Sequence, residues 1–140
     1  MKKRLLFYSL LIVGLLTSCA EEERHPLPYV RVDVSIPIDW YPDLMGGLPV
    51  KVLQHCGYNN NRIIIVPQGA GDKYEAFDAT CTRDITTDIA SINVNTGTFT
   101  ATCPKCSTVY NLHTGYAQNQ SFRLQRYRAY RSGNRIIITN

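Results

Sequence analysis

The 140-residue sequence lacks an excess of charge of either sign once its first residues are set aside. Three of its 15 basic residues are Lys2, Lys3 and Arg4, which we assign to a leader, so 12 remain against 11 acidic residues. A chain so evenly charged gives no general reason to expect nucleic acid as a partner. Long apolar runs are scarce too, and a single one excludes a protein that crosses the membrane many times.

Signatures of catalysis are also missing. The sequence has no Gly-x-Ser-x-Gly, no His-Glu-x-x-His and no glycine loop of the kind that cradles phosphate. Its three histidines, His25, His55 and His113, have no spaced partners. We therefore assign no catalytic residue, and any enzymatic role would be of the oxidoreductase kind, with electron transfer favoured.

The leader is defined by its charge and its length. Basic residues precede an apolar run of 12 residues from Leu5 to Leu16, which is shorter than the roughly 20 residues of a membrane-spanning helix. This pattern predicts a signal peptide over 1–18. The following Leu16-Thr17-Ser18-Cys19 resembles the lipobox of bacterial lipoproteins, which implies that Cys19 is lipidated and holds the protein at a membrane. The alternative is a plain secretory signal with a chance cysteine.

Residues 19–28 are charged and contain proline, so we expect a tether rather than folded structure. Glu21, Glu22 and Glu23 follow Cys19 closely and resemble the surface-export signal of Bacteroidetes lipoproteins. That resemblance implies an outer-membrane lipoprotein of the cell envelope, exposed at the cell surface. The alternative is that these acidic residues are only a solvated linker.

Residues 29–140 are predicted to form an all-β domain, because no window of 12 residues has a helical apolar stripe. Val30, Val32, Val34 and Ile36 alternate with polar residues and predict a first strand over 29–36. A loop rich in proline and glycine should follow over 37–49, pinned to the body by Trp40 and Tyr41. Turn signals separate further strands, as in a sandwich or small barrel. We expect these strands at 50–53, 62–66, 74–78, 92–94, 98–102, 124–130 and 135–139.

Four cysteines remain besides Cys19, namely Cys56, Cys81, Cys103 and Cys106. An even number in an exported chain favours disulfides. The Cys-x-x-Cys spacing of Cys103 and Cys106 favours metal binding or thiol redox chemistry instead. A reactive thiolate is best placed at a helix N-terminus, whereas the residues after Cys106 predict a strand, so thiol redox catalysis by this pair is the weaker alternative.

Two segments resemble the cluster-binding loops of Rieske [2Fe-2S] proteins. Tyr74-Glu75-Ala76-Phe77-Asp78-Ala79-Thr80-Cys81 resembles the strand that leads into the first loop. Cys103-Pro104-Lys105-Cys106-Ser107-Thr108-Val109-Tyr110-Asn111 resembles the second loop, and residues 112–115 continue the likeness. Residues 124–127 and 135–138 look like the closing hairpin. The resemblance implies a Rieske-like antiparallel sandwich or small barrel over 29–140, with its two cysteine-bearing loops brought together.

The same resemblance implies that both histidine ligands are absent. A Rieske centre uses two cysteines on one iron and two histidines on the other. Cys81 and Cys103 match the cysteine positions, whereas Arg83 and Cys106 stand where the histidines would be. An arginine is always protonated and has no lone pair to offer a metal. A Rieske cluster of the usual kind is therefore not expected.

Three outcomes remain for the cysteines. We favour the absence of any cofactor, with Cys81 in a disulfide to Cys103 or Cys106, because the resemblance implies that the two loops meet. Such a bond contributes about 2–4 kcal/mol. The alternatives are zinc or an atypical [2Fe-2S] cluster on Cys81, Cys103 and Cys106, with a fourth ligand from Cys56, His55 or His113.

These inferences define the expected function. The chain is interpreted as a membrane-anchored lipoprotein whose Rieske-like domain lacks both cluster histidines and acts as a non-catalytic structural or interaction module. The first alternative is an electron-transfer protein with an atypical [2Fe-2S] cluster. A further alternative is a thiol-redox protein that uses Cys103 and Cys106.

Overall fold

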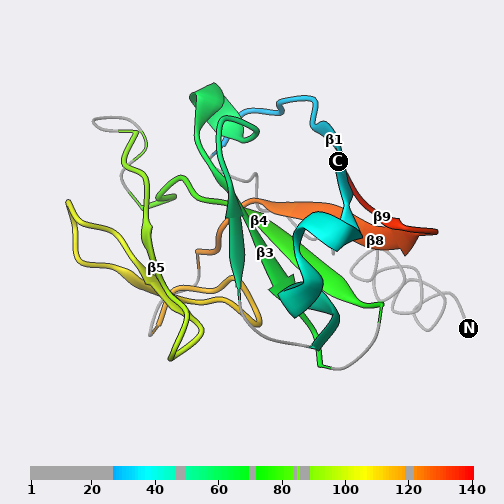
Figure 1. Ribbon diagram of the computed structural model, residues 1–140. Coiled ribbons are helices and arrows are strands. Elements are labelled where there is room, and N and C mark those ends of the chain that lie inside the picture. The colour runs from blue at the N-terminus through cyan, green and yellow to red at the C-terminus, as the bar shows by residue number, and fades with distance from the viewer. Residues whose placement is uncertain (1–26, 47–49, 70–71, 84, 86–88, 119–121) are drawn as a thin grey trace, which may run out of the picture.

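The computed structural model describes residues 27–46, 50–69, 72–83, 85, 89–118 and 122–140. The predicted signal peptide, Cys19 and most of the tether lie outside these residues. Nine short strands run through the described chain (Figure 1). They are β1 (Asp33–Pro37), β2 (Lys51–Leu53), β3 (Ile63–Pro67), β4 (Tyr74–Asp78), β5 (Asn93–Asn95), β6 (Thr100–Thr102), β7 (Val109–Asn111), β8 (Arg126–Ser132) and β9 (Arg135–Thr139).

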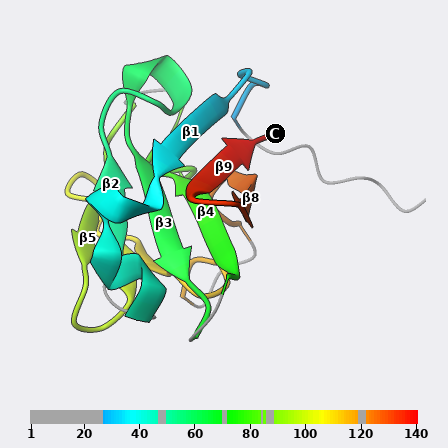
Figure 2. The same ribbon diagram turned by 45° about the vertical axis from the view of Figure 1, so that its right-hand side comes forward.

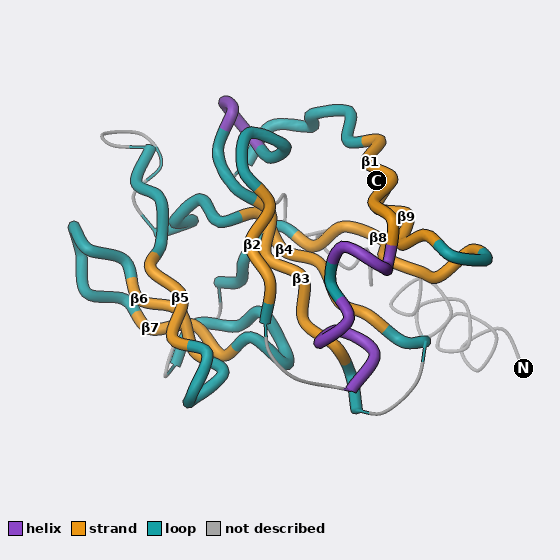
Figure 3. The backbone as a smooth tube through the Cα atoms, viewed as in Figure 1, coloured by secondary structure: helices purple, strands orange, loops and turns teal. Residues whose placement is uncertain are grey.

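The strands form two antiparallel sheets. One is a curled six-stranded sheet in the order β1-β9-β8-β4-β3-β2, and the other is a three-stranded sheet in the order β5-β6-β7 (Figures 1 and 2). The only helices among the described residues are short 3-10 turns in the connections between strands (Figure 3). None of the helices in the described part of the chain has the length and apolar character needed to span a membrane. The prediction of an all-β fold is confirmed.

The two faces of the large sheet pack against two separate cores. Every residue of β3 is buried, and its side chains alternate between them. Ile63 and Ile65 join a core under β1 and β9, whereas Ile64 and Val66 join a core that also includes residues of the small sheet. A strand covered on both faces needs an unbroken apolar run, which is what residues 63–66 supply. The second core carries the cysteine loops.

The connection after β1 differs from the expected loop. It holds two 3-10 helices, η1 (Ile38–Trp40) and η2 (Pro42–Gly46). Ile38 and Leu44 are buried in the first core, whereas Trp40 is 72% exposed. The prediction that Trp40 pins this segment is therefore wrong, although Tyr41 does pack partly against the core. The aliphatic side chains anchor the segment because they are the ones that the 3-10 turns direct inward.

The side chain of Asn140, after β9, is hydrogen-bonded to the segment that precedes β1. The Asn140 side chain accepts a hydrogen bond from Val32 N at 3.0 Å and donates one to the carbonyl of Val30. The Tyr29 hydroxyl also donates to Asn140, at 3.4 Å. β1 then continues beside β9 in antiparallel register, from Asp33 opposite Thr139 to Pro37 opposite Arg135. The beginning and the end of the described domain therefore lie together.

We expect Gly115→Ala to destabilise the protein more than Gly133→Ala. Both glycines have positive φ, 80° and 58°, so both alanines incur the left-handed cost of about 1–2 kcal/mol. Only at Gly115 would the new Cβ meet another group, the ring of buried Phe77 at 2.6 Å. That clash should lower the free energy of unfolding by about 1–3 kcal/mol more. Urea unfolding of the two variants measures the difference, and equal losses would contradict the close packing of Gly115 on Phe77.

Candidate functional site

The first cysteine loop is fixed where it leaves β4. The buried carboxylate of Asp78 accepts hydrogen bonds from Tyr58 N at 2.6 Å, Thr80 N at 2.9 Å and the Tyr127 hydroxyl at 2.8 Å. Three donors satisfy a carboxylate that would be costly to bury alone. Thr80 N is thereby held in place just before Cys81.

Hydrogen bonds to the far side of the loop complete its anchoring. Ile92 N donates to Ala79 O at 2.8 Å, and Cys81 N donates to Ala90 O at 2.9 Å. Residues 79–81 are thus tied to residues 90–92, which lead into β5 of the small sheet. Cys81 is only 1% exposed as a result.

The second loop joins β6 to β7 and is closed by its own backbone. Cys103 N donates to Thr108 O, and Ser107 N donates to Cys103 O, both at 2.9 Å. Ser107 has a φ of 58°, which is unusual for a residue with a side chain and marks a tightly constrained turn. The turn buries Cys103 and leaves Cys106 partly exposed.

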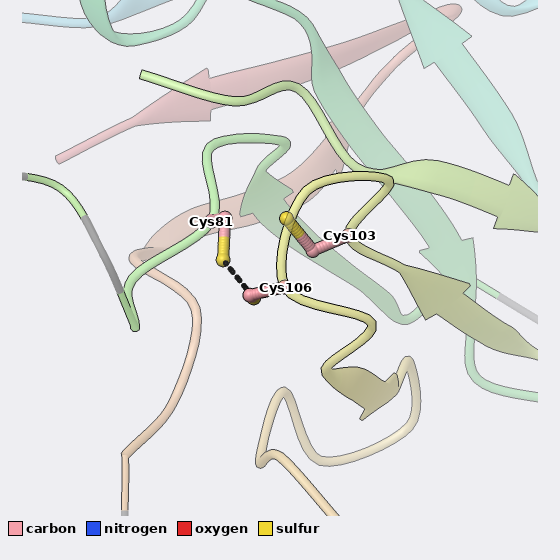
Figure 4. Close-up of side chains that lie close together, drawn as sticks. All are labelled: Cys81, Cys103 and Cys106. Carbon is pink, nitrogen blue, oxygen red and sulfur yellow. Dashed lines mark hydrogen bonds between the residues drawn. The ribbon is translucent and has the colours of Figure 1, made fainter. Parts of the chain in front are cut away.

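The two loops bring three sulfur atoms to one place. The Sγ atoms of Cys81, Cys103 and Cys106 all lie within 4.8 Å of one another. Cys81 and Cys106 face each other across the loops with 3.6 Å between their sulfurs, and Cys103 lies beside them (Figure 4). The sequence prediction that the two cysteine loops meet agrees with this arrangement.

Tyr110, the central residue of β7, links the second loop to the first. Its buried hydroxyl accepts a hydrogen bond from Thr82 N at 3.1 Å. The same hydroxyl lies 3.3 Å from Cys81 Sγ and 3.3 Å from Thr82 Oγ1. Because its oxygen already accepts from the backbone, its hydrogen is available to the sulfur or to the threonine. Burial, together with the contact to Cys81, raises the pKa of Tyr110, so this hydroxyl stays protonated.

Arg83 reaches from the first loop to the second. Its Nη1 donates to Thr108 Oγ1 at 3.2 Å, and the same oxygen lies 3.1 Å from Cys106 Sγ. The guanidinium can only donate, so the threonine oxygen accepts from it and the threonine hydrogen is available to Cys106. A positive charge is therefore connected to Cys106 through one hydroxyl group.

The surroundings of Cys81 and Cys106 shift the pKa values of these two facing thiols in opposite directions. Burial is the main reason why the pKa of Cys81 rises to about 11. Burial also raises the pKa of Cys106, but hydrogen bonds outweigh this effect and lower that pKa to about 7. These bonds come from the hydroxyl and backbone N–H of Thr108 and from the thiols of Cys103 and Cys81. The partly exposed thiol is thus the readily ionised one, and the buried thiol stays protonated.

The other predicted ligands lie elsewhere. Cys56 packs against the core under β1 and β9 and donates to Gln54 O at 3.0 Å, so it is not part of the three-sulfur group. His55 is exposed at the same bend. His113 is exposed and stacks on Phe99 with ring centroids 4.7 Å apart. The structure brings neither histidine to the three sulfurs.

The disulfide expected between Cys81 and Cys103 or Cys106 is not found, and all four cysteines that the structure describes are unbridged. A disulfide needs sulfurs about 2.05 Å apart, whereas Cys81 and Cys106 are 3.6 Å apart. A separation of 3.6 Å is that of two unbonded thiols in contact. The hydroxyls of Thr108 and Tyr110 contact the sulfurs of Cys106 and Cys81.

Two residues of the site, Thr108 and Tyr110, were given no role in the sequence analysis. Thr108, Tyr110 and Leu112 are buried, while Val109 and Asn111 between them are half-buried. A strand with this alternation directs every second side chain into the core. Polar groups at such inward positions are the signal that could have identified both residues.

Comparison with solved structures identifies the fold. The plasma membrane Rieske protein PetC3 from Synechocystis PCC 6803 matches with a TM-score of 0.50 and 21% identity, over 80% of this chain and 100% of that one. The ferredoxin of carbazole 1,9a-dioxygenase from Nocardioides aromaticivorans IC177 matches with a TM-score of 0.44 and 18% identity, over 78% and 94%. The E. coli protein NirD matches with a TM-score of 0.44 and 13% identity, over 81% and 96%.

No protein-family model matches the chain, and no curated protein sequence matches it significantly. The fold is nevertheless Rieske-like, as the resemblance of the two loops and the closing hairpin implies. The residues present do not fit a Rieske cluster. Arg83 donates to Thr108 and has no lone pair with which to ligate iron. By the resemblance of the loops, Arg83 and Cys106 stand where a Rieske centre has its two histidines, and Cys106 offers sulfur in place of an imidazole.

We expect Cys106 to be alkylated at lower pH than Cys81 in the reduced, chelator-treated protein. The thiolate is the reactive form, so the rate at Cys106 should rise with pH and reach half its maximum near pH 7. Cys81, with its pKa near 11, should stay unreactive over the same range. Mass spectrometry after a short iodoacetamide pulse locates the label. Thr108→Val, which removes the hydroxyl contact, should move the Cys106 midpoint upward, and an unchanged midpoint would contradict its role.

Proposed function

We propose that the protein is an envelope lipoprotein, anchored to the outer membrane by a lipid on Cys19, whose Rieske-like domain acts as a non-catalytic structural or interaction module. One observation supports the proposal that the domain has lost the Rieske cluster. By the resemblance of the first loop, Arg83 stands at a histidine position, and its guanidinium donates to Thr108. An arginine at that place has no electron pair to offer a metal ion, so it cannot replace a histidine ligand.

The anchoring part of the proposal rests on the sequence of the leader. A basic start, a short apolar run and Leu16-Thr17-Ser18-Cys19 occur in the order found in lipoproteins. Glu21, Glu22 and Glu23 favour exposure at the cell surface. The domain then begins after a tether of about ten residues, which lets it stand off from the membrane.

The three neighbouring sulfurs support one alternative, which is electron transfer through an atypical [2Fe-2S] cluster. It requires a fourth ligand, and none of Cys56, His55 and His113 belongs to the three-sulfur group in the described residues. The proposed role therefore has no electron-transfer step.

Lipidation predicts a specific labelling pattern. In cells fed a clickable fatty-acid analogue, the wild-type protein and Cys56→Ser should carry the label, because their Cys19 is intact. Cys19→Ser should carry none, because the thiol that accepts the lipid is gone. In-gel fluorescence of the immunoprecipitated protein makes the comparison. An unlabelled wild-type protein, or a labelled Cys19→Ser variant, would contradict anchoring at Cys19.

Loss of the cluster predicts the metal content of the protein. Wild-type protein purified anaerobically from the envelope should lack the two irons and the visible absorbance of a [2Fe-2S] centre. The matched variant is Arg83→His with Cys106→His, which restores two imidazoles. We expect this variant, but not the wild type, to take up iron and sulfide on anaerobic reconstitution. Two irons per wild-type chain would refute the proposal, and a double variant that stays colourless would refute the assignment of positions 83 and 106.

A further inference from the structure

We propose that Cys81, Cys103 and Cys106 form a binding site for one thiophilic metal ion of the zinc class, in place of a two-iron cluster. The carrying observation is the convergence of the three sulfurs within 4.8 Å of one another. Thiolates are preferred ligands of such soft or borderline ions. The site rests on the proposed absence of a Rieske cluster and adds a ligand to the module.

The spacing of the sulfurs fits a single ion. Zinc–sulfur bonds of about 2.3 Å in a tetrahedral site place neighbouring sulfurs roughly 3.8 Å apart. The Cys81 and Cys106 sulfurs are 3.6 Å apart, and the third lies within the 4.8 Å limit. In a two-iron cluster, ligands of different irons are held apart by the cluster itself. By the loop resemblance Cys106 stands at a position of the second iron, yet its sulfur lies only 3.6 Å from that of Cys81, which is close enough for both to bind one ion.

The surroundings suit an ion with one open coordination position. Cys81 and Cys103 are each 1% exposed, whereas Cys106 is partly exposed at the mouth of the site. Three protein ligands with a fourth position facing solvent is an arrangement that zinc accepts. The Tyr110 and Thr108 hydroxyls contact the sulfurs of Cys81 and Cys106, which is how outer residues orient metal ligands.

The positive charge of Arg83 would offset the negative charge of a metal ion bound by three thiolates. Three thiolates and one divalent cation leave a net charge of minus one, and such a charge is costly in a partly buried place unless it is compensated. Arg83 reaches the Thr108 hydroxyl, which contacts Cys106. We assign Arg83 as a positioning residue that offsets this charge from outside the ligand set.

The test uses the full-length lipidated protein, purified in detergent, then reduced and freed of metal by a chelator. Zn²⁺ is titrated in competition with a chromophoric chelator, and Co²⁺ reports thiolate coordination through its visible absorption bands. Wild-type protein and Cys56→Ser should each bind one ion per chain. Cys106→Ser should bind more than about 100-fold more weakly, and Arg83→Gln about 10-fold more weakly, as is typical of outer-sphere losses. Circular dichroism checks that each variant is folded.

A second measurement does not depend on variants. Zn²⁺ should protect the partly exposed Cys106 of the wild-type protein from alkylation and leave Cys56 unprotected. The site is refuted if no ion binds, if Cys106→Ser binds like the wild type, or if the envelope-purified protein carries a disulfide between any two of Cys81, Cys103 and Cys106. A failure of zinc binding in iron-free protein overturns only this site. Two irons per chain would overturn the proposed function as well.

Discussion

The Tyr110 hydroxyl is the contact on which the cysteine site depends. It belongs to the strand after the second loop and bonds the backbone of the first loop at Thr82, beside the sulfur of Cys81. Tyr110 is fully buried, so its hydroxyl must find partners inside the protein, and the first loop supplies them. The position of each loop therefore fixes that of the other. The meeting of Cys106 with Cys81 follows from this link and from the turn that Ser107 closes.

Much of the fold could be predicted because its strands carry local signals. β4 and β9 have the bounds that alternation and turn residues predict, and β8 pairs with β9 as a hairpin around Gly133. The structure of the connection after β1 was harder to predict, because short 3-10 turns have no apolar periodicity of their own. Nothing in the order of residues 38–44 shows that Ile38 and Leu44 turn inward while Trp40 turns out, since this depends on the core that receives them.

The site was predictable in its parts but not in its chemistry. Spacing and resemblance indicated that Cys81, Cys103 and Cys106 share one place, whereas Cys56 packs against the other core. The sequence does not say whether neighbouring thiols join in a disulfide, because that depends on the distance between their sulfurs in the folded loops. Arg83 illustrates the same limit. Its inability to bind metal is evident from its chemistry, but its reach to Thr108 is a property of the folded loops.

The hydrogen bonds of the Asn140 side chain with Val30 and Val32 hold the two ends of the domain at the same side of the molecule. The chain enters and finishes at one end, and the C-terminus lies on the side away from the β5-β6-β7 sheet, which carries the second cysteine loop (Figures 1 and 2). If Cys19 holds the protein to a lipid bilayer, the tether joins the domain on the side away from the β5-β6-β7 sheet. The second cysteine loop, with its partly exposed Cys106, would then lie on the side of the domain away from the membrane attachment.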